Sequence, residues 1–137
     1  VGPLGHVVAV VLTQEDADLL KSMKLCTHAI VASATEPIEG LEKALEVNHG
    51  HEYDISICCV NIENCEMSCI LPVKDGGTCY FFSMATSFTK ATLGAEGCGK
   101  DVDIMMGNGY TSGHAEIALS ELRANPVLRS YFESKYM

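Results

Sequence analysis

Short apolar runs alternate along the chain with segments whose apolar residues recur at helical spacing. Continuous runs rich in β-branched residues are typical of strands that are buried on both faces of a parallel sheet. Five segments have this pattern and are expected to be strands: His6–Leu12, His28–Ala32, Tyr53–Ile62, Thr78–Ser83 and Val102–Met106. Gly76 and Gly77 are expected to turn the chain into the fourth strand.

Helix signals occupy most of the intervals between these strands. Thr13 is placed to cap a helix, with Asp16 three residues later as its partner, and Pro37 suits the first position of the next helix. The buried face of that second helix is expected to comprise Ile38, Leu41 and Leu45. Further helices are expected at 64–71, around 117–122 and from 126 onward. The glycine-rich segment between the last two strands is expected to be a long polar loop.

This alternation predicts an α/β fold in which a parallel sheet has helices on both faces and right-handed crossovers. The expected class is a Rossmann-like, doubly wound parallel sheet, formed by one domain over residues 1–137. Such a sheet begins with a strand and a glycine-rich turn that places a dinucleotide pyrophosphate at a helix N-terminus. The chain has no such opening, because Gly94, Gly97 and Gly99 follow a loop instead of a strand.

The first apolar run, His6–Leu12, is therefore better matched to the second strand of a Rossmann unit. The chain then holds strands 2 to 6 and lacks the first βα unit. In the order 3-2-1-4-5-6, loss of strand 1 leaves roughly five backbone groups on each side without partners, at about 1–3 kcal/mol for each one that is buried. We expect either that strand 1 is supplied from elsewhere or that strands 2 and 4 close up.

Composition narrows the functional classes. The chain has 137 residues, of which 47% are hydrophobic, as expected for one globular domain with a buried core. A net charge of -9 disfavours a nucleic-acid partner, because such proteins need clustered Lys and Arg. No apolar run approaches the roughly 20 residues of a membrane span, and no basic segment precedes an apolar one at the amino end.

The seven cysteines are expected to be reduced thiols, which favours a cytoplasmic location. Their number is odd, and Cys58, Cys59 and Cys79 lie inside apolar runs, where thiols act as small core residues. Cys65 and Cys69 are four residues apart, but no Cys or His pair follows at a familiar zinc spacing. We therefore expect no metal site.

Candidate ligand-binding residues follow from the doubly wound sheet, in which ligands bind at the carboxyl ends of the strands. Asn61 is expected to end the third strand, and Ser83 and Met84 the fourth, so that they line a nicotinamide ribose and ring. Gly107 and Asn108 follow the fifth strand. A turn or cap role is the alternative for each of these residues. Lys90, in the expected loop, is either a ligand for a substrate carboxylate or a solvated charge.

The wording of several segments closely resembles one enzyme family. The most specific are THAIVASATEP at 27–37, CVNIENCEMSCIL at 59–71, the long stretch from DGGTCYFF to GHAEIAL at 75–119, and LRANPVLRSYF near the end. They resemble the L-erythro-3,5-diaminohexanoate dehydrogenase family, medium-chain dehydrogenase-like enzymes of lysine fermentation. The resemblance covers the whole chain and implies a C-terminal fragment, since the family's enzyme has an additional amino-terminal catalytic portion.

The resemblance implies NAD-dependent oxidative deamination of L-erythro-3,5-diaminohexanoate to 5-amino-3-oxohexanoate and ammonia, in lysine degradation. This chain is then part of the dinucleotide-binding domain, inactive alone, and the catalytic acid or base lies in the absent part. The chain departs from a typical NAD site at the end of its first strand. Val11 and Leu12 stand where Asp or Glu would bond the ribose hydroxyls, and Thr13 follows. Thr13 is thus a candidate cofactor contact, and NADP is not excluded.

Two other functions are compatible with the same residues. One is a stand-alone nucleotide-binding or regulatory module without chemistry, and the other is a different medium-chain alcohol or carbonyl oxidoreductase. The expected partners are a dinucleotide and a small amino-acid substrate, with no nucleic acid and no membrane. The strand Val102–Met106 is the outermost in the 3-2-1-4-5-6 order. An apolar edge promotes association unless it is paired, so we expect a homodimer through this strand.

Overall fold

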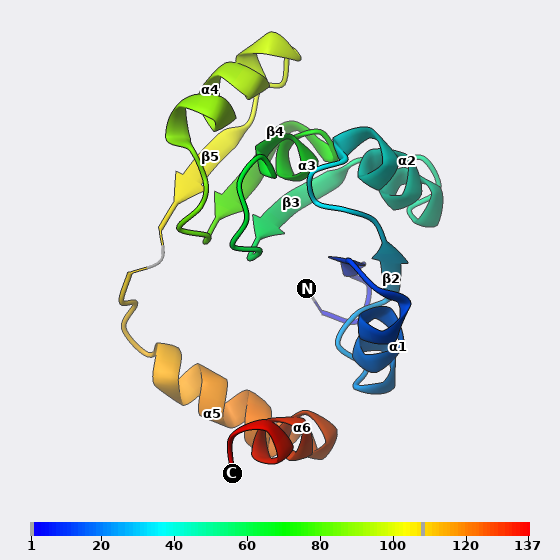
Figure 1. The fold of residues 1–137 in the computed structure, drawn as a ribbon, viewed down its shortest axis with the longest axis vertical. Helices are drawn as coiled ribbons and strands as arrows, with labels where there is room; N and C mark the ends of the chain where they lie inside the picture. Colours follow the sequence, from blue (N-terminus) through cyan, green and yellow to red (C-terminus); the bar gives the residue numbers. More distant parts are fainter. Residues whose placement is uncertain (1, 108) are drawn as a thin grey trace.

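The structure, a computed structural model, describes residues 2–107 and 109–137 and has an α/β architecture (Figure 1). Every strand pairing is parallel, which confirms the predicted fold class. The elements in chain order are β1 (Val8–Val11), α1 (Gln14–Ser22), β2 (His28–Val31), α2 (Pro37–Val47), β3 (Tyr53–Cys58), α3 (Glu66–Ile70), β4 (Val73–Phe81), α4 (Phe88–Gly97), β5 (Asp103–Met106), α5 (His114–Ala124) and α6 (Pro126–Tyr136). No helix in the described ranges has both the length and the apolarity to cross a membrane.

The strands form two separate sheets, one of β1 and β2 and one with the order β3-β4-β5. If β1 is the second Rossmann strand, the division lies where strand 1 belongs, between β1 and β3. Within the described residues β1 and β3 do not pair, so the alternative that these two strands close up is wrong. In the part of the chain that the structure describes, each of them has one edge without a neighbouring strand.

The strand β4 begins five residues earlier than predicted, at Val73, so Gly76 and Gly77 lie inside it and not in a preceding turn. The pairing with β3 passes from Tyr53 opposite Val73 directly to Ile55 opposite Thr78, which makes β4 bulge between these pairs. Gly76 supplies the positive φ of 76° that the bulge needs. The prediction that Gly76 and Gly77 turn the chain into the fourth strand was therefore wrong, because both lie inside β4 and Gly76 bends that strand.

The segment predicted as a long loop contains the helix α4, and that prediction was wrong. The hydroxyl of Ser87 caps this helix by accepting a hydrogen bond from the backbone N–H of Lys90. Ala91 and Ala95 are the buried positions of α4, and small side chains at this spacing give little periodic signal. Gly94 lies against α3, since a Cβ atom there would stand 2.6 Å from Met67 Sδ. The glycine that weakened the helix signal thus permits close helix packing.

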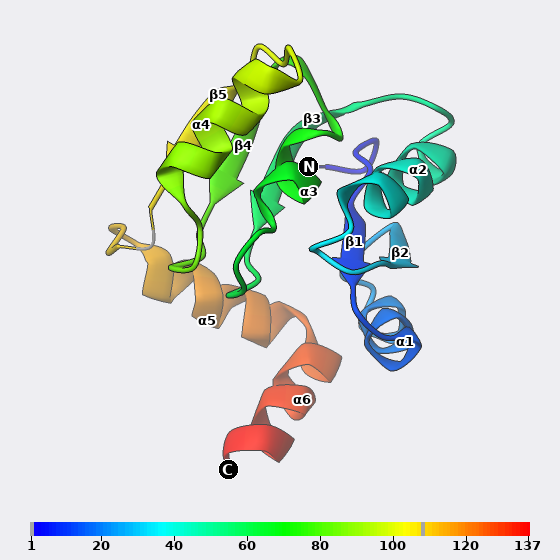
Figure 2. The same ribbon diagram turned by 45° about the horizontal axis from the view of Figure 1, so that its top comes forward.

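The core lies between the β3-β4-β5 sheet and the helices α3 and α4, which cover one face of that sheet (Figure 2). Phe81, Ile70 and Val73 are its largest fully buried side chains. Ser56, behind α3, donates from its hydroxyl to Cys69 Sγ at 3.2 Å. This packing fixes the carboxyl ends of β3 and β4 beside the first turns of two helices.

Four of the seven cysteines belong to this core, and all seven are free thiols. Cys59 is exposed, contrary to prediction, because β3 ends at Cys58 and the next residue turns outward. Cys58 Sγ lies 3.5 Å from Cys65 Sγ, and burial, together with this contact, raises the pKa of Cys58 to about 12. In the described ranges no group of three or more Cys, His, Asp or Glu side chains is arranged to hold a metal ion.

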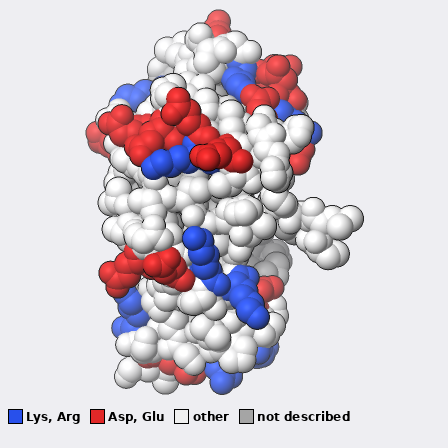
Figure 3. Space-filling view, turned by 90° about the vertical axis from the view of Figure 1, so that its right-hand side faces the viewer, with Lys and Arg blue, Asp and Glu red and all other residues white. Residues whose placement is uncertain are grey.

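The opposite face of the β3-β4-β5 sheet is apolar and open. Neighbours in register in a parallel sheet share a face, so Ile57, Tyr80 and Met105 form one row across the three strands. Ile57 is 63% exposed and Met105 is 53% exposed. On another face of the molecule, charged side chains gather in clusters around a broad uncharged area (Figure 3). The open face of the sheet therefore exposes apolar side chains that a covering surface usually buries.

The helices α5 and α6 pack mainly on each other and stand apart from the β3-β4-β5 sheet (Figure 1). Neither has a buried residue, and Ile117 of α5 is 64% exposed. Asn125, between them, donates from Nδ2 to the carbonyl oxygen of Met23 at 3.0 Å, which ties this pair to the end of α1. Ile38 of α2 is 60% exposed as well, so its predicted burial was wrong.

Candidate functional site

The candidate site lies in the loops after β3 and β4, at the carboxyl ends of parallel strands. Asn61 lies three residues beyond the end of β3 and not in the strand itself. Its Oδ1 accepts hydrogen bonds from Ser83 Oγ and from the backbone N–H of Ala85, both at 3.2 Å. These two bonds join the loops, and the described residues provide no partner for Asn61 Nδ2. Its amide donors are therefore available to a ligand.

The loop after β4 carries three further features of a binding site. Ser83 orients Asn61, and the next residue, Met84, is 80% exposed and presents an apolar side chain. Thr86 Oγ1 is buried and has no hydrogen-bond partner among the described residues. A buried hydroxyl without a partner costs about 1–3 kcal/mol. Such an atom in a loop at the sheet's carboxyl edge fits a site completed by a ligand or by further chain.

Gly107 is held directly beside the end of β4. Its N–H donates to the carbonyl oxygen of Phe81 at 3.2 Å, and its own carbonyl accepts from the Tyr80 hydroxyl at 2.8 Å. The structure thus places Gly107 at the same edge as the Asn61–Ser83 pair. Asn108, the other candidate after the fifth strand, lies outside the described residues.

Thr13 lies at the carboxyl end of β1, in the two-stranded sheet. Its hydroxyl accepts from the backbone N–H of Asp16 at 3.1 Å and donates to Asp16 Oδ2 at 2.7 Å, as the predicted helix cap requires. Both functions of the hydroxyl are occupied within the chain. The structure therefore brings Asn61, Ser83 and Met84 together and leaves Thr13 in the other sheet.

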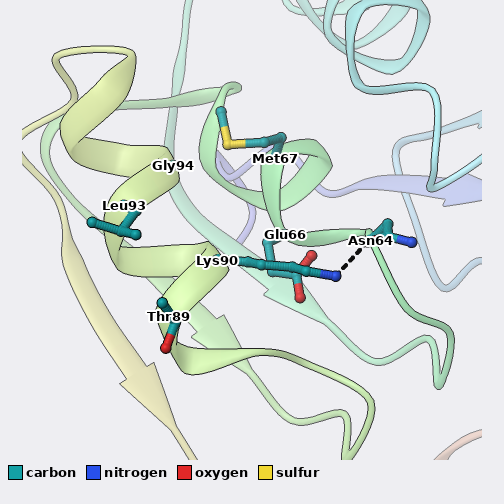
Figure 4. A pocket seen from close by; sticks show the side chains of 7 residues that line it. All are labelled: Asn64, Glu66, Met67, Thr89, Lys90, Leu93 and Gly94. Atoms are coloured by element: carbon teal, nitrogen blue, oxygen red, sulfur yellow. Dashed lines mark hydrogen bonds between the residues drawn. The ribbon is translucent and has the colours of Figure 1, made fainter.

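A cavity of about 360 Å³ opens between the first turns of α3 and α4 (Figure 4). It is lined by Asn64, Glu66, Met67, Thr89, Lys90, Leu93 and Gly94. Glu66 is only 3% exposed, and its Oε1 accepts from the backbone N–H of Ser87 at 2.8 Å. Sequence reasoning singled out Lys90 but missed Glu66, because an acidic residue at a helix start looks like an ordinary dipole partner.

The sequence of the chain was compared with those of known proteins. No protein-family model matches the chain. It is 58% identical over all 137 residues to L-erythro-3,5-diaminohexanoate dehydrogenase of Acetoanaerobium sticklandii, and 50% identical to that of Fusobacterium nucleatum subsp. nucleatum. The chain spans 40% of the length of each relative. Over its whole length, therefore, the chain is similar to part of L-erythro-3,5-diaminohexanoate dehydrogenase, and the predicted resemblance is confirmed.

Proposed function

We propose that this chain is part of the dinucleotide-binding domain of an NAD-dependent L-erythro-3,5-diaminohexanoate dehydrogenase. The observation that carries the proposal is 58% identity along the entire chain to a dehydrogenase of that name. The parallel strands with polar side chains in the loops at their carboxyl ends support it, since such edges bind ligands in α/β folds. Residues 1–137 then form one cofactor-domain fragment of a longer polypeptide.

The proposed reaction oxidises the amine-bearing carbon at position 3 of the substrate. NAD, when bound, accepts the hydride that leaves this carbon. Water then hydrolyses the resulting imine, which releases ammonia and gives 5-amino-3-oxohexanoate. This chain contributes binding and orientation, and the acid or base of the reaction lies in the part of the polypeptide beyond these residues.

Each candidate residue has a defined task in this proposal. Asn61 offers its Nδ2 donors to the cofactor, because Ser83 and Ala85 already hold its Oδ1. Met84 supplies an exposed apolar surface for the nicotinamide ring. Gly107 brings backbone toward the carboxamide, and Asn108 is the proposed contact next to it in sequence. Thr13 is proposed to reach the ribose through its backbone, because its hydroxyl caps α1. The thiols, which are all free, support the expected cytoplasmic location.

The decisive experiment is an assay of the complete polypeptide with L-erythro-3,5-diaminohexanoate. With NAD we expect NADH and ammonia to form in equal amounts, and with NADP we expect slower formation of NADPH and ammonia. Asn61→Ala should raise the KM for NAD about tenfold, the effect of losing roughly one or two hydrogen bonds. Asn48→Ala is the control, because Asn48 donates only to the carbonyl of His51 in a turn after α2.

Three results would contradict parts of this proposal. NAD binding without turnover of any amine would favour a regulatory module. Turnover of alcohols or carbonyl compounds in place of the diamine would favour another oxidoreductase of similar fold. An unchanged KM for NAD in Asn61→Ala would remove Asn61 from the cofactor site while leaving the reaction intact.

We further propose that the complete protein forms a homodimer through the free edge of β5. This strand pairs only with β4 among the described residues, and Met105 beside that edge is 53% exposed. Unpaired edges of this kind associate unless they are covered. Sedimentation at micromolar concentration should give a dimer, and Ile104→Pro, which removes a backbone donor from β5, should weaken it. A monomeric wild-type protein would contradict the dimer.

A further inference from the structure

The cavity between α3 and α4 contains a buried carboxylate that the chain satisfies only in part. Glu66 is 3% exposed, and its Oε1 accepts from the Ser87 N–H. No hydrogen bond to Oε2 and no ion pair of this carboxylate occurs in the described residues. Buried charges in proteins are normally paired, because their desolvation is costly. The free oxygen of Glu66 therefore has capacity for a cation.

The opposite wall of the cavity presents a positive charge. Lys90 belongs to the first turn of α4, where the helix dipole disfavours a cation. Its Nζ nevertheless reaches across to Asn64 Oδ1, which accepts at 2.6 Å (Figure 4). An ammonium group has three donors, so two remain beside the cavity. Lys90 and Glu66 line the same space without forming an ion pair with each other.

We propose that this cavity is a binding subsite for an amino acid of the diaminohexanoate class. Glu66 Oε2 accepts from an ammonium group of the ligand, and Lys90, released in part from Asn64, binds its carboxylate. Met67 and Leu93 contact the aliphatic carbons between these groups. The volume of about 360 Å³ is sufficient for a straight-chain amino acid. The inference rests on the proposed function only for this choice of ligand.

The charge pattern itself requires a ligand that has both groups. An amine alone would leave Lys90 with Asn64, and a carboxylic acid alone would bring a second negative charge next to Glu66. Electrostatic complementarity of this kind determines which ligands are accepted more than it determines overall affinity. A zwitterionic amino acid is therefore selected over its monofunctional analogues.

Calorimetry on the complete polypeptide without NAD tests this inference. The probes are L-erythro-3,5-diaminohexanoate, butylamine and butanoate. Wild-type protein should bind the diamino acid and neither analogue. Glu66→Gln retains an oxygen acceptor for Ser87 but removes the charge, and Lys90→Met retains the aliphatic stem. Each variant should weaken binding about tenfold or more, as expected for loss of a charged hydrogen bond.

Lys74→Met is the matched control, because Lys74 pairs with Asp54 at the other end of the sheet and is about half exposed. Its affinity for the diamino acid should equal that of wild type. If Glu66→Gln fails to fold, the exposed Lys90 decides the test alone. Equal binding by Lys90→Met and wild type, or no binding by wild type, overturns the subsite.

The outcome is separable from that of the proposed function. Oxidation of the diamino acid with an unchanged KM in both variants would refute the subsite and leave the reaction standing. Binding that is lost in both variants, in a protein without dehydrogenase activity, would support the subsite and refute the reaction.

Discussion

Joining the chain to a β-strand and glycine-rich turn of the kind proposed to precede it should raise its affinity for NAD from undetectable to the micromolar range. The division between the two sheets supplies the reason. The strands β1 and β3 each have a free edge, and Val10 and Ile55 on these strands are 51% and 60% exposed. A strand inserted between them would pair with both edges and place its turn where the dinucleotide phosphates bind.

Calorimetric titration with NAD and denaturant unfolding would measure this gain on the chain alone and on the joined form. The joined form should unfold cooperatively and at higher denaturant concentration, because about ten additional ladder hydrogen bonds contribute roughly 0.5–1.5 kcal/mol each. A control fusion with prolines in the added strand keeps the length but removes the backbone donors. Equal NAD affinity in the short chain and the joined form would refute the hypothesis that a strand inserted between β1 and β3 completes the dinucleotide site.

Phe81→Ala should lower the free energy of unfolding by about 3–5 kcal/mol, as large aromatic truncations in a core do. Phe81 ends β4, is 1% exposed, and is the largest of the fully buried side chains. Domains are stable by only about 5–15 kcal/mol, so this substitution removes a large share of the total. The same change should loosen the loop that carries Ser83 and Met84.

Phe82→Ala is the matched control for this prediction. Its ring is adjacent in sequence, stacks at 6.5 Å on Tyr80 and is 47% exposed on the open face of the sheet. We expect a loss of about 1 kcal/mol or less, the usual scale for partly exposed positions. Urea unfolding of the complete polypeptide measures both variants. Their midpoints report the difference in stability if the dependence of the unfolding free energy on urea is the same for both. Similar losses for both would show that the open face is covered by the rest of the protein.

Elements with strong local signals were predictable from the sequence. The apolar runs gave all five strands, and the Thr13–Asp16 cap and Pro37 gave the starts of two helices. Strand ends were less predictable, because a run such as 53–62 stays apolar beyond the last backbone pair at Cys58. Hydrophobic residues indicate burial, whereas a strand ends where its backbone pairing with the neighbouring strand ends.

The helix α4 and the cavity beside it could not be predicted for a different reason. Its buried positions are Ala91 and Ala95, and its glycines lower helix propensity. The packing of Gly94 on Met67 and the bond from Ser87 to Glu66 are tertiary contacts across 27 and 21 residues, respectively. Such contacts leave no periodic pattern in the sequence. The bonds of Glu66 to Ser87 and of Asn64 to Lys90 are therefore visible only in the structure.

Some apolar residues have the spacing of buried positions but are exposed in the structure. Ile38, Ile117 and Ile57 have the spacing of buried positions, yet each is at least 60% exposed. Nothing in the described residues covers them. Their pattern fits the proposal that further chain or a second subunit covers these surfaces.

The hydrogen bond from the Ser87 N–H to Glu66 has a mechanical consequence. It links the start of α4 to the start of α3. The loops that precede these two helices are therefore connected by one hydrogen bond. A displacement of either loop must stretch or break that bond. The motions of the two loops at this edge should consequently be coupled. A ligand that binds one loop should reduce the fluctuations of both.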